Sequence, residues 1–385
     1  MSELYIGLMS GTSLDGIDAG LVEFDDDKFK LLAFEYLPFS DDIKQDIQYL
    51  SQTNSSIRLT KYGVIDTQLG HLFARASNSL LTKSGISKSA ITAIGSHGQT
   101  IYHAPDLSSS FSLQIGDPNI IAEETGITTV ADFRRRDIAA GGQGAPLVPA
   151  FHQAIFSQQF DLSKQNITIV NIGGIANITY LSAGKTIGFD TGPGNTLMDF
   201  WVQKNLHRAY DKDGSWAKTG KSNLDLVEAL KQDPYFKLSL PKSTGKEYFS
   251  PSWLNEKISH TPDCSAKDIQ ASLCCLTAET ITEAIQQHAP LTDRTLICGG
   301  GMHNSHLVEL IKNNLNHPVS STAEFGINPD HVEAMAFAWL ARQTMHNLSG
   351  NLTEVTGAKN PVILGGIYPG RNGLIKQRMK THSHK

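Results

Sequence analysis

The sequence predicts an α/β protein of two domains in which one structural plan occurs twice. Its 385 residues exceed what one hydrophobic core commonly supports. Residues 4–24 and 167–181 each contain an apolar strand, a turn of small and hydroxyl residues, and a second apolar strand. In both halves a third strand, helices and a further strand follow, which is typical of a duplicated fold with mixed sheets.

Apolar periodicity predicts the elements of the first half. Its expected strands are residues 4–9, 17–24, 31–37, 91–95, 112–115 and 128–132. Its expected helices are residues 41–52, residues 57–83 and a helix that begins at Pro118. The first three strands follow one another directly, so we expect them to pair antiparallel.

The second half repeats this order. Its expected strands are residues 167–172, 175–182, 186–190 and 294–298, and its expected helices are residues 265–289, 304–316 and 330–347. The stretch 207–262 is richer in Lys, Asp, Ser and Pro, and we expect it to form a peripheral insertion of short helices and loops.

The boundary between the domains is expected where three arginines lead into a glycine-rich stretch, at residues 134–146. The first domain is then residues 1–133 with 350–385, and the second is residues 134–349. Residues 141–144 provide a candidate hinge between the two domains.

Composition excludes several classes of protein. The net charge of -5 argues against nucleic-acid binding as the main role, and we treat the basic stretch 375–385 as a frayed end. No segment has the length and apolarity of a membrane span, and the N-terminus does not resemble a signal peptide. Four cysteines without Cys-x-x-Cys spacing argue against a zinc site or a disulfide scaffold and favour the reducing cytoplasm.

The two turns have the composition of a phosphate-binding backbone, because glycine and serine leave N–H groups accessible to an anion. The candidate phosphate ligands are Gly11, Thr12, Ser13, Asp15, Gly16 and Asp18 in the first segment, and Asn171, Gly173, Gly174 and Asn177 in the second. The first turn alone would be an ordinary tight turn, and the second copy favours a function. Asp15 or Asp18 is expected near the water shell of Mg²⁺, with no dedicated metal site, because Mg²⁺ needs few protein ligands when phosphates supply oxygen.

Asp190 is the candidate general base. It ends a strand and precedes a glycine turn at Gly192 and a helix that begins near Asn195. A carboxylate in such a place can take a proton from a nucleophile beside bound phosphate. The alternative is that Asp190 caps the following helix, but Asn195 is better placed for that cap.

A third glycine motif follows the strand at 294–298. Gly299, Gly300, Gly301 and Asn304 are the candidate contacts to adenosine, and the alternative is a plain strand–helix turn. Composition and spacing thus indicate an ATP-dependent phosphotransferase that acts on a small polar molecule.

Six motifs in this order resemble those of the anhydro-N-acetylmuramic acid kinase family over roughly residues 4–368. They are residues 7–18 (GLMSGTSLDGID), 96–100 (SHGQT), 142–149 (GQGAPLVP), 171–177 (NIGGIAN), 190–195 (DTGPGN) and 298–301 (CGGG). The resemblance implies the duplicated actin-like, ribonuclease H-like ATPase fold of the actin/Hsp70/sugar-kinase superfamily, with an interdomain cleft.

The resemblance also implies a reaction and its partners. ATP and Mg²⁺ are the expected cofactors, and a small molecule, 1,6-anhydro-N-acetylmuramic acid, is the expected substrate. Its anhydro ring is opened by water and O6 is phosphorylated, a step in peptidoglycan recycling. A cytoplasmic homodimer is expected, with neither nucleic acid nor membrane as a partner.

Several side chains are expected to contact this sugar. Arg136 is chosen from residues 134–136 to bind the lactyl carboxylate, because a guanidinium binds a carboxylate in a bidentate way. His97 and Gln99 end a strand where sites form in open α/β sheets, although a lone histidine is more often structural. Glu333 is a candidate near the anhydro oxygen, or else a helix carboxylate at the surface. Gly192 and Asn195 complete the expected sugar contacts.

Two other classes of protein remain open from the residues. A non-catalytic nucleotide-gated protein of the Hsp70 or actin kind would need length for a further domain. A glycoside hydrolase that uses Asp190 and Glu333 without ATP would leave the glycine motifs without a purpose. A different sugar kinase of the same superfamily is the remaining alternative.

Overall fold

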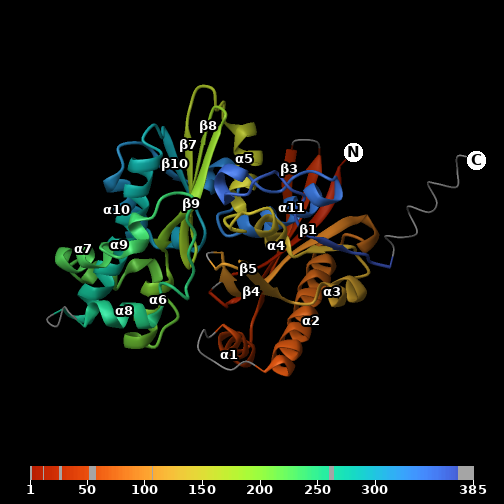
Figure 1. The fold of residues 1–385 in the computed structure, drawn as a ribbon, viewed down its shortest axis with the longest axis horizontal. Coiled ribbons are helices and arrows are strands. Elements are labelled where there is room, and N and C mark those ends of the chain that lie inside the picture. The colour runs from red at the N-terminus through yellow and green to blue at the C-terminus, as the bar shows by residue number, and fades with distance from the viewer. Residues whose placement is uncertain are drawn as a thin grey trace, which may run out of the picture. The chain divides into compact units, whose positions relative to one another are not determined.

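A computed structural model describes residues 2–11, 13–25, 28–51, 58–105, 107–259 and 264–371. The chain divides into two compact units (Figure 1). Unit 1 is Met1–Phe151 with His331–Lys385, and unit 2 is His152–Asp330. The chain therefore leaves unit 1 once and returns to it, as expected, but the crossings differ from the predicted 133/134 and 349/350. The difference arises because residues 133–151 and the helix after His331 pack within unit 1.

Unit 1 contains a seven-stranded mixed sheet. Its strands are β1 (Glu3–Ser10), β2 (Gly16–Asp25), β3 (Lys28–Pro38), β4 (Ile91–Ala104), β5 (Phe111–Ile115), β6 (Thr129–Ala131) and β12 (Gly366–Tyr368). The order is β12-β6-β4-β1-β2-β3, and β5 pairs with β4. The first three strands are antiparallel, whereas β4 lies parallel to β1 and β6 parallel to β4.

Helices cover both faces of this sheet. Those of unit 1 are α1 (Asp41–Leu50), α2 (Leu59–Ser84), α3 (Pro118–Thr125), α4 (Phe133–Ala139), α11 (Val332–Met345) and α12 (Thr353–Thr356), and α5 (Val148–Gln159) begins there. The buried Ile65, Leu69 and Phe73 of α2 pack with Ile6 and Leu8 of β1 in one core. Side chains alternate along a strand, so α11 lies on the opposite face, against Gly7.

Unit 2 repeats the strand order of unit 1. Its strands are β7 (Ile167–Ile172), β8 (Ile175–Ser182), β9 (Lys185–Pro193), β10 (Arg294–Cys298) and β11 (Val319–Ser321). The order β11-β10-β7-β8-β9 corresponds to β6-β4-β1-β2-β3, with the same parallel and antiparallel pairings. This correspondence confirms the predicted duplicated α/β fold with mixed sheets.

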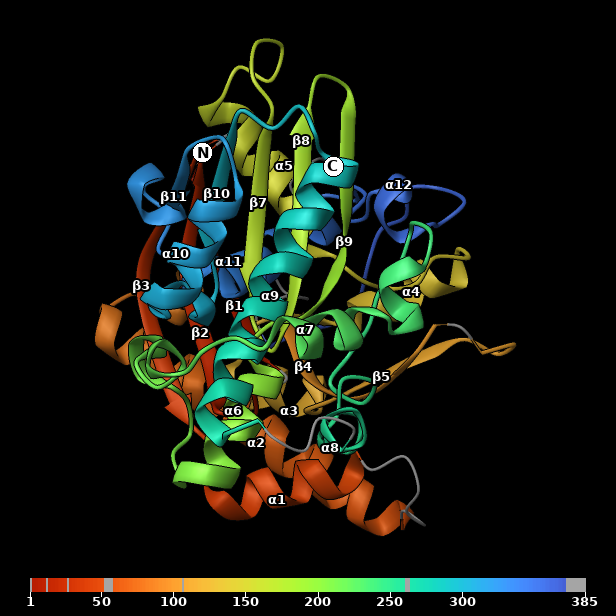
Figure 2. The same cartoon turned by 90° about the vertical axis from the view of Figure 1, so that its left-hand side faces the viewer.

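The remaining elements of unit 2 are helical. They are α6 (Thr196–Leu206), α7 (Leu224–Lys231), α8 (Pro251–Ile258), α9 (Ala266–His288), α10 (Ser305–Asn314) and several single 3-10 turns. Figure 2 shows α9 lying across the sheet, where it contacts β8 and β9. Within the described residues, no helix is both long enough and apolar enough to cross a membrane.

The four cysteines, all of them within the described residues, lie in unit 2 and form no disulfide bond. Cys274 and Cys298 are buried, and Cys264 and Cys275 are half-buried. Burial raises the pKa of the Cys275 thiol to about 11, and it raises that of Cys274 as well.

The glycine-rich stretch 140–146, expected to be the boundary and hinge, lies inside unit 1 and is fastened to it. Asp137 is fully buried. Its carboxylate accepts hydrogen bonds from Gly144 N at 2.8 Å and from Asn351 Nδ2 and Thr356 Oγ1 at 2.7 Å each. Gly142 must be a glycine, because a Cβ there would lie 2.3 Å from an oxygen of Asp137.

The Asp137 network generates a stability prediction. Asp137→Ala leaves an amide, a side-chain NH₂ and a hydroxyl buried without their acceptor, at a cost of about 3 kcal/mol. We expect the apparent melting temperature to fall by roughly 5–10 °C in a calorimetric scan. Glu256→Ala is the control, since that exposed carboxylate lies on α8, in the other unit. Equal melting temperatures for both variants would contradict this role of Asp137.

Candidate functional site

The first turn connects β1 to β2, and a residue of the neighbouring strand β4 supports it by hydrogen bonds. Ser10 Oγ lies 2.7 Å from Gln99 Oε1 and 3.0 Å from the carbonyl oxygen of Gly16. Gln99 Nε2 donates to the carbonyl oxygen of Gly11 at 3.4 Å. Gly16 cannot carry a Cβ, which would lie 2.4 Å from the carbonyl oxygen of Leu37. Ser10, Gly11 and Gly16 are therefore held in place on both sides of the turn, and Gln99 is one of the supports.

The polar side chains of this turn are accessible to solvent to different degrees. Ser13 and Asp15 are exposed, and Asp18 on β2 is half-buried. Burial, then Asp15 and Asp18, raise the pKa of Tyr36 on the neighbouring strand β3. The predicted ligand Thr12 lies outside the described residues. The turn and the start of β2 thus carry two carboxylates, Asp15 and Asp18.

His97 and Gln99, separated by Gly98 on β4, both make hydrogen bonds within unit 1. Both are buried. Gln99 binds the turn, as described above. The Nδ1–H of His97 donates to the carbonyl of Gly98 at 2.8 Å, so Nε2 accepts from the guanidinium of Arg134 at 2.9 Å. Burial, then Arg134, holds the pKa of His97 well below its usual value, which fixes the neutral imidazole. Their contact with sugar stays a prediction.

The three arginines of α4 have three different environments. Arg134 is half-buried and also donates to the carbonyl of Gly144 at 2.8 Å. Arg135 forms an ion pair with Asp132, in which the guanidinium nitrogen lies 2.6 Å from the carboxylate oxygen. Arg136 is exposed, and its guanidinium has no hydrogen bond or ion pair among the residues that the structure describes. Of the three, Arg136 is the one whose guanidinium is available to a ligand.

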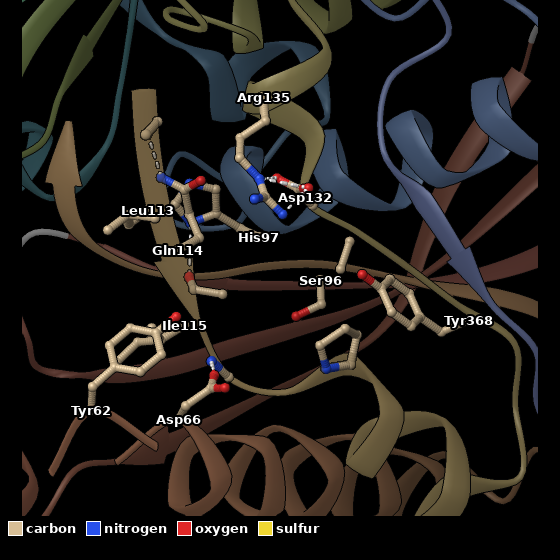
Figure 3. A pocket seen from close by; sticks show the side chains of 15 residues that line it. Tyr62, Asp66, Ser96, His97, Leu113, Gln114, Ile115, Asp132, Arg135 and Tyr368 are labelled. Atoms are coloured by element: carbon tan, nitrogen blue, oxygen red, sulfur yellow. Dashed lines mark hydrogen bonds and ion pairs between the residues drawn. The ribbon is translucent and has the colours of Figure 1, made fainter. Parts of the chain in front are cut away.

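A polar cavity of about 140 Å³ opens beside Arg135 in unit 1 (Figure 3). The side chains of Ser96 and Gln114 contribute to its lining from β4 and β5, and Asp66 contributes from α2. Ser96 Oγ and Gln114 Oε1 are buried and have no partner within the described part of the chain. Burial raises the pKa of Asp66, whose Oδ1 accepts from Gly116 N at 2.7 Å. Of the predicted site residues, His97 alone lines this cavity.

The second turn lies above a row of polar side chains that crosses the sheet of unit 2. Asn171 pairs with Asn177, Asn177 with Asp190, and Asn171 on its other side with Cys298. Directly paired residues place their side chains on the same face, with Cβ atoms about 5 Å apart. Asn177 Oδ1 is buried without a partner among the described residues. The sheet register thus places the candidate base Asp190 beside the candidate phosphate ligands Asn171 and Asn177, whose roles stay predictions.

The glycines of the second turn bind the start of α6 by main-chain hydrogen bonds. Asn195 N donates to the carbonyl of Gly173 and Gly194 N to that of Gly174, each at 2.9 Å. The predicted side-chain cap by Asn195 is wrong, because its Nδ2 donates instead to the carbonyl of Ile172 at 3.3 Å. A Cβ on Gly194 would lie 2.4 Å from the carbonyl of Gly173, so this contact requires glycine.

Asp190 is 7% exposed and is held by a segment that the sequence analysis missed. Its Oδ2 accepts from Thr244 N at 2.9 Å and its carbonyl accepts from the Tyr235 hydroxyl at 2.6 Å. Its own N–H donates to the carbonyl of Lys242 at 3.3 Å. Because the carboxylate binds Thr244, Asp190 is not the cap of α6. A Cβ on Gly192 would lie 2.8 Å from the ring of Phe236 in the same segment.

Two glycines of the third motif pack closely against β7. Gly299 (φ 79°) and Gly301 approach β7, where a Cβ would meet Asn171 Oδ1 at 2.4 Å and Ile172 Cγ2 at 2.3 Å. Gly300 faces open space. Asn304 Oδ1 accepts from Leu307 N at 3.0 Å and so caps α10. Gly300 is therefore the position where a planar ligand has room to approach.

Glu333 lies in the first turn of α11 in unit 1, and it is half-buried. Each unit thus carries its own set of candidate residues. Unit 1 holds the first turn, residues 96–99, Arg136 and Glu333, and unit 2 holds the second turn, Asp190 and the glycine motif after β10. The described residues contain no cluster of three or more His, Cys, Asp or Glu side chains that suits a metal ion.

Comparison with known proteins agrees with the motifs. The model of the family described as anhydro-N-acetylmuramic acid kinase matches residues 3–370. A protein of that name from Photobacterium profundum is 49% identical over 376 residues, which cover 95% of this chain and 99% of the relative. Its namesake from Vibrio cholerae is 48% identical over 372 residues, with 95% and 98% covered. A match of this extent over the whole motif set shows that the chain belongs to the anhydro-N-acetylmuramic acid kinase family.

Proposed function

We propose that this kinase opens the 1,6-anhydro ring of 1,6-anhydro-N-acetylmuramic acid with water and phosphorylates O6 from ATP. The products are N-acetylmuramic acid 6-phosphate and ADP, and the role is in peptidoglycan recycling. The family membership supports the substrate. The observation that carries the mechanism is the buried carboxylate of Asp190, which is fixed by a main-chain N–H beside the second turn.

The reaction needs one base and two coupled bond exchanges. The oxygen of water bonds to C1 of the sugar while the C1–O6 bond breaks, and Asp190 accepts the proton of that water. O6 then bonds to the γ-phosphorus of ATP, and the bond between that phosphorus and the β-phosphate oxygen breaks. The leaving O6 passes its charge to phosphorus, so no separate acid is required as in ordinary glycoside hydrolysis. The proton on Asp190 returns to solvent.

The remaining predicted residues receive proposed roles in substrate binding. The two turns hold the phosphates of ATP, and Gly300 leaves room for adenosine. Arg136 is the proposed partner of the lactyl carboxylate, because it is exposed and unpaired among the described residues. Glu333 is the proposed contact near the anhydro oxygen.

Mg²⁺ is the proposed metal, and the donors of the first turn fit it. Asp15 and Asp18 offer the hard oxygen ligands that Mg²⁺ prefers. Because the described residues hold no larger acidic cluster, phosphate and water must supply most of its ligands. Bound to the nucleotide, the ion would neutralise charge on the phosphates. We also propose that the protein is a homodimer in the cytoplasm. Light scattering after gel filtration tests the dimer.

Product analysis tests the proposed function directly. The enzyme is incubated with ATP, Mg²⁺ and 1,6-anhydro-N-acetylmuramic acid in ¹⁸O-labelled water. We expect a product that has gained both water and phosphate, with label at the anomeric carbon and one ADP formed for each sugar. A phosphorylated sugar with the anhydro ring intact would indicate a different sugar kinase. ADP without any sugar phosphate would indicate a nucleotide-gated protein.

Asp190→Asn tests the base. The amide oxygen can still accept from Thr244 N, but it cannot take a proton from water. We expect near-normal binding of ATP and sugar and a fall in turnover of roughly 10²–10⁴ in single-turnover kinetics. Label entry at the anomeric carbon and ADP release should fall together. Asp225→Asn on α7, where the residue is exposed, is the matched control. Wild-type turnover of Asp190→Asn would exclude Asp190 as the base, and Glu333 would be tested next.

Gly11→Val tests the first turn. A Cβ at Gly11 would find its nearest neighbour, Ser13 Oγ, at 3.8 Å, so the protein itself has room for a side chain. A branched side chain would nevertheless keep phosphate from the backbone. We expect ATP affinity measured by calorimetry to collapse while the melting temperature stays unchanged. Gly63→Ala, at an open position of α2, is the control. Unchanged ATP binding would remove this turn from the site.

A further inference from the structure

Residues 234–249 form a segment that runs from the 3-10 turn Pro234–Lys237 towards α8 and covers part of β9. Aromatic side chains fasten it to unit 2, since Tyr235 and Phe249 are buried in the core cluster. Asp233, directly before it, accepts from Tyr235 N at 3.0 Å, from the Tyr248 hydroxyl at 2.7 Å and from Trp253 Nε1 at 2.8 Å. The segment is therefore a built part of the unit, rather than the peripheral insertion that composition indicated.

The segment contacts Asp190 at all three of its polar groups. The carboxylate accepts from Thr244 N, the carbonyl accepts from the Tyr235 hydroxyl, and the N–H donates to the carbonyl of Lys242. β9 is an edge strand of its sheet, so it offers main-chain groups that a neighbouring segment can bind. The geometry of Asp190 thus depends on where residues 242–244 lie.

Lys242 fixes this part of the segment by its own side chain. It is 7% exposed, an unusual degree of burial for a lysine. Its Nζ donates to the carbonyl oxygens of Tyr235 and Phe236 at 3.4 and 3.5 Å. The same atom lies 4.8 Å from the ring centre of Tyr235 and 5.7 Å from that of Phe189, the residue before Asp190. Carbonyl oxygens and aromatic faces both stabilise a cation.

We propose that Lys242 is a positioning residue for the general base: its buried ammonium keeps Asp190 in the carboxylate form and fixes the segment that binds it. This inference rests on the role of Asp190 proposed above. A buried cation is costly unless polar or negatively charged groups compensate it. The carbonyl oxygens of Tyr235 and Phe236 do so by hydrogen bonds, and the negative charge of Asp190 acts on the same ammonium. Burial lowers the pKa of Lys242, and the Asp190 carboxylate opposes this by raising it. The interaction is mutual, so the ammonium must favour the ionised carboxylate in turn.

Two other titratable groups close to Asp190 are uncharged at neutral pH and cannot replace this charge. Burial, then Asp190, raises the pKa of Tyr235, which stays a neutral hydroxyl. On α9, burial and then Lys242 lower the pKa of His288, whose ring lies 5.1 Å from that of Phe189. Further along the segment, burial lowers the pKa of Lys246 to about 8, where Glu247 is its opposing charge.

The test is the pH dependence of kcat and kcat/KM for Lys242→Met. Removing the cation raises the pKa of Asp190, so the acid limb of kcat should move by about one pH unit to higher pH. A displaced segment should also lower kcat by roughly 10–100-fold with little change in KM for the sugar. Lys237→Met, an exposed lysine of the same segment, should leave both unchanged. Lys242→Arg retains the charge and should return the acid limb towards its wild-type position.

The outcomes separate this inference from the proposed function. If the wild-type enzyme does not form the hydrated sugar phosphate, the proposed function fails before any variant is compared. If it does, and Lys242→Met keeps the wild-type acid limb, the inference is overturned, whatever happens to kcat. Should Lys242→Met fail to fold, as judged by circular dichroism, Lys242→Gln is measured in its place, because its amide can still donate to both carbonyls. Product formation by the wild-type enzyme and the position of the acid limb in the variant then decide in the same way.

Discussion

The close approach of α11 to the sheet is the constraint on which unit 1 depends. A Cβ on Gly7 would lie 1.8 Å from the carbonyl oxygen of Ala334, and one on Gly95 would lie 2.0 Å from that of Phe337. Glycine at the centre of β1 and of β4 therefore lets a helix backbone rest directly on two strand backbones. β1 ends at Ser10, whose hydroxyl binds Gln99 within β4, and these two residues support the first turn. The packing of one helix thus constrains the two strands that support the first turn.

In both units, hydrogen bonds from a neighbouring segment fix the candidate polar groups. Each functional element follows a buried strand, and a neighbouring segment binds it through hydrogen bonds that leave it little freedom. Gln99 does this for the first turn, whereas Thr244 and Tyr235 do it for Asp190. A fixed donor or base costs no reorganisation when the reaction occurs, which is how enzymes stabilise developing charge. The supports are therefore as much a part of the site as the groups that would touch substrate.

Local patterns predicted the strands and long helices, because burial of one face dictates their periodicity. The row of Asn171, Asn177 and Asp190 was predictable as a set, although only the register of three strands shows that the side chains are neighbours. The fastening of residues 140–146 was not predictable. It depends on Asn351 and Thr356, which lie more than two hundred residues along the chain from Asp137. The signal for residues 234–249 was the run Pro241 to Gly245 of mostly small residues, and the surrounding polar composition concealed it.

The state of the cysteines has a practical consequence for the handling of this enzyme. A thiol reacts with alkylating agents and peroxides as the thiolate. Since burial raises the pKa of Cys275 to about 11 and that of Cys274 as well, few of these side chains are ionised near neutral pH. The sulfur atoms of Cys274 and Cys275 are accordingly poor nucleophiles, and fluorescent maleimides would label these two positions slowly. A cysteine introduced at an exposed position, such as Lys237, would react faster than these two and could carry a spectroscopic probe.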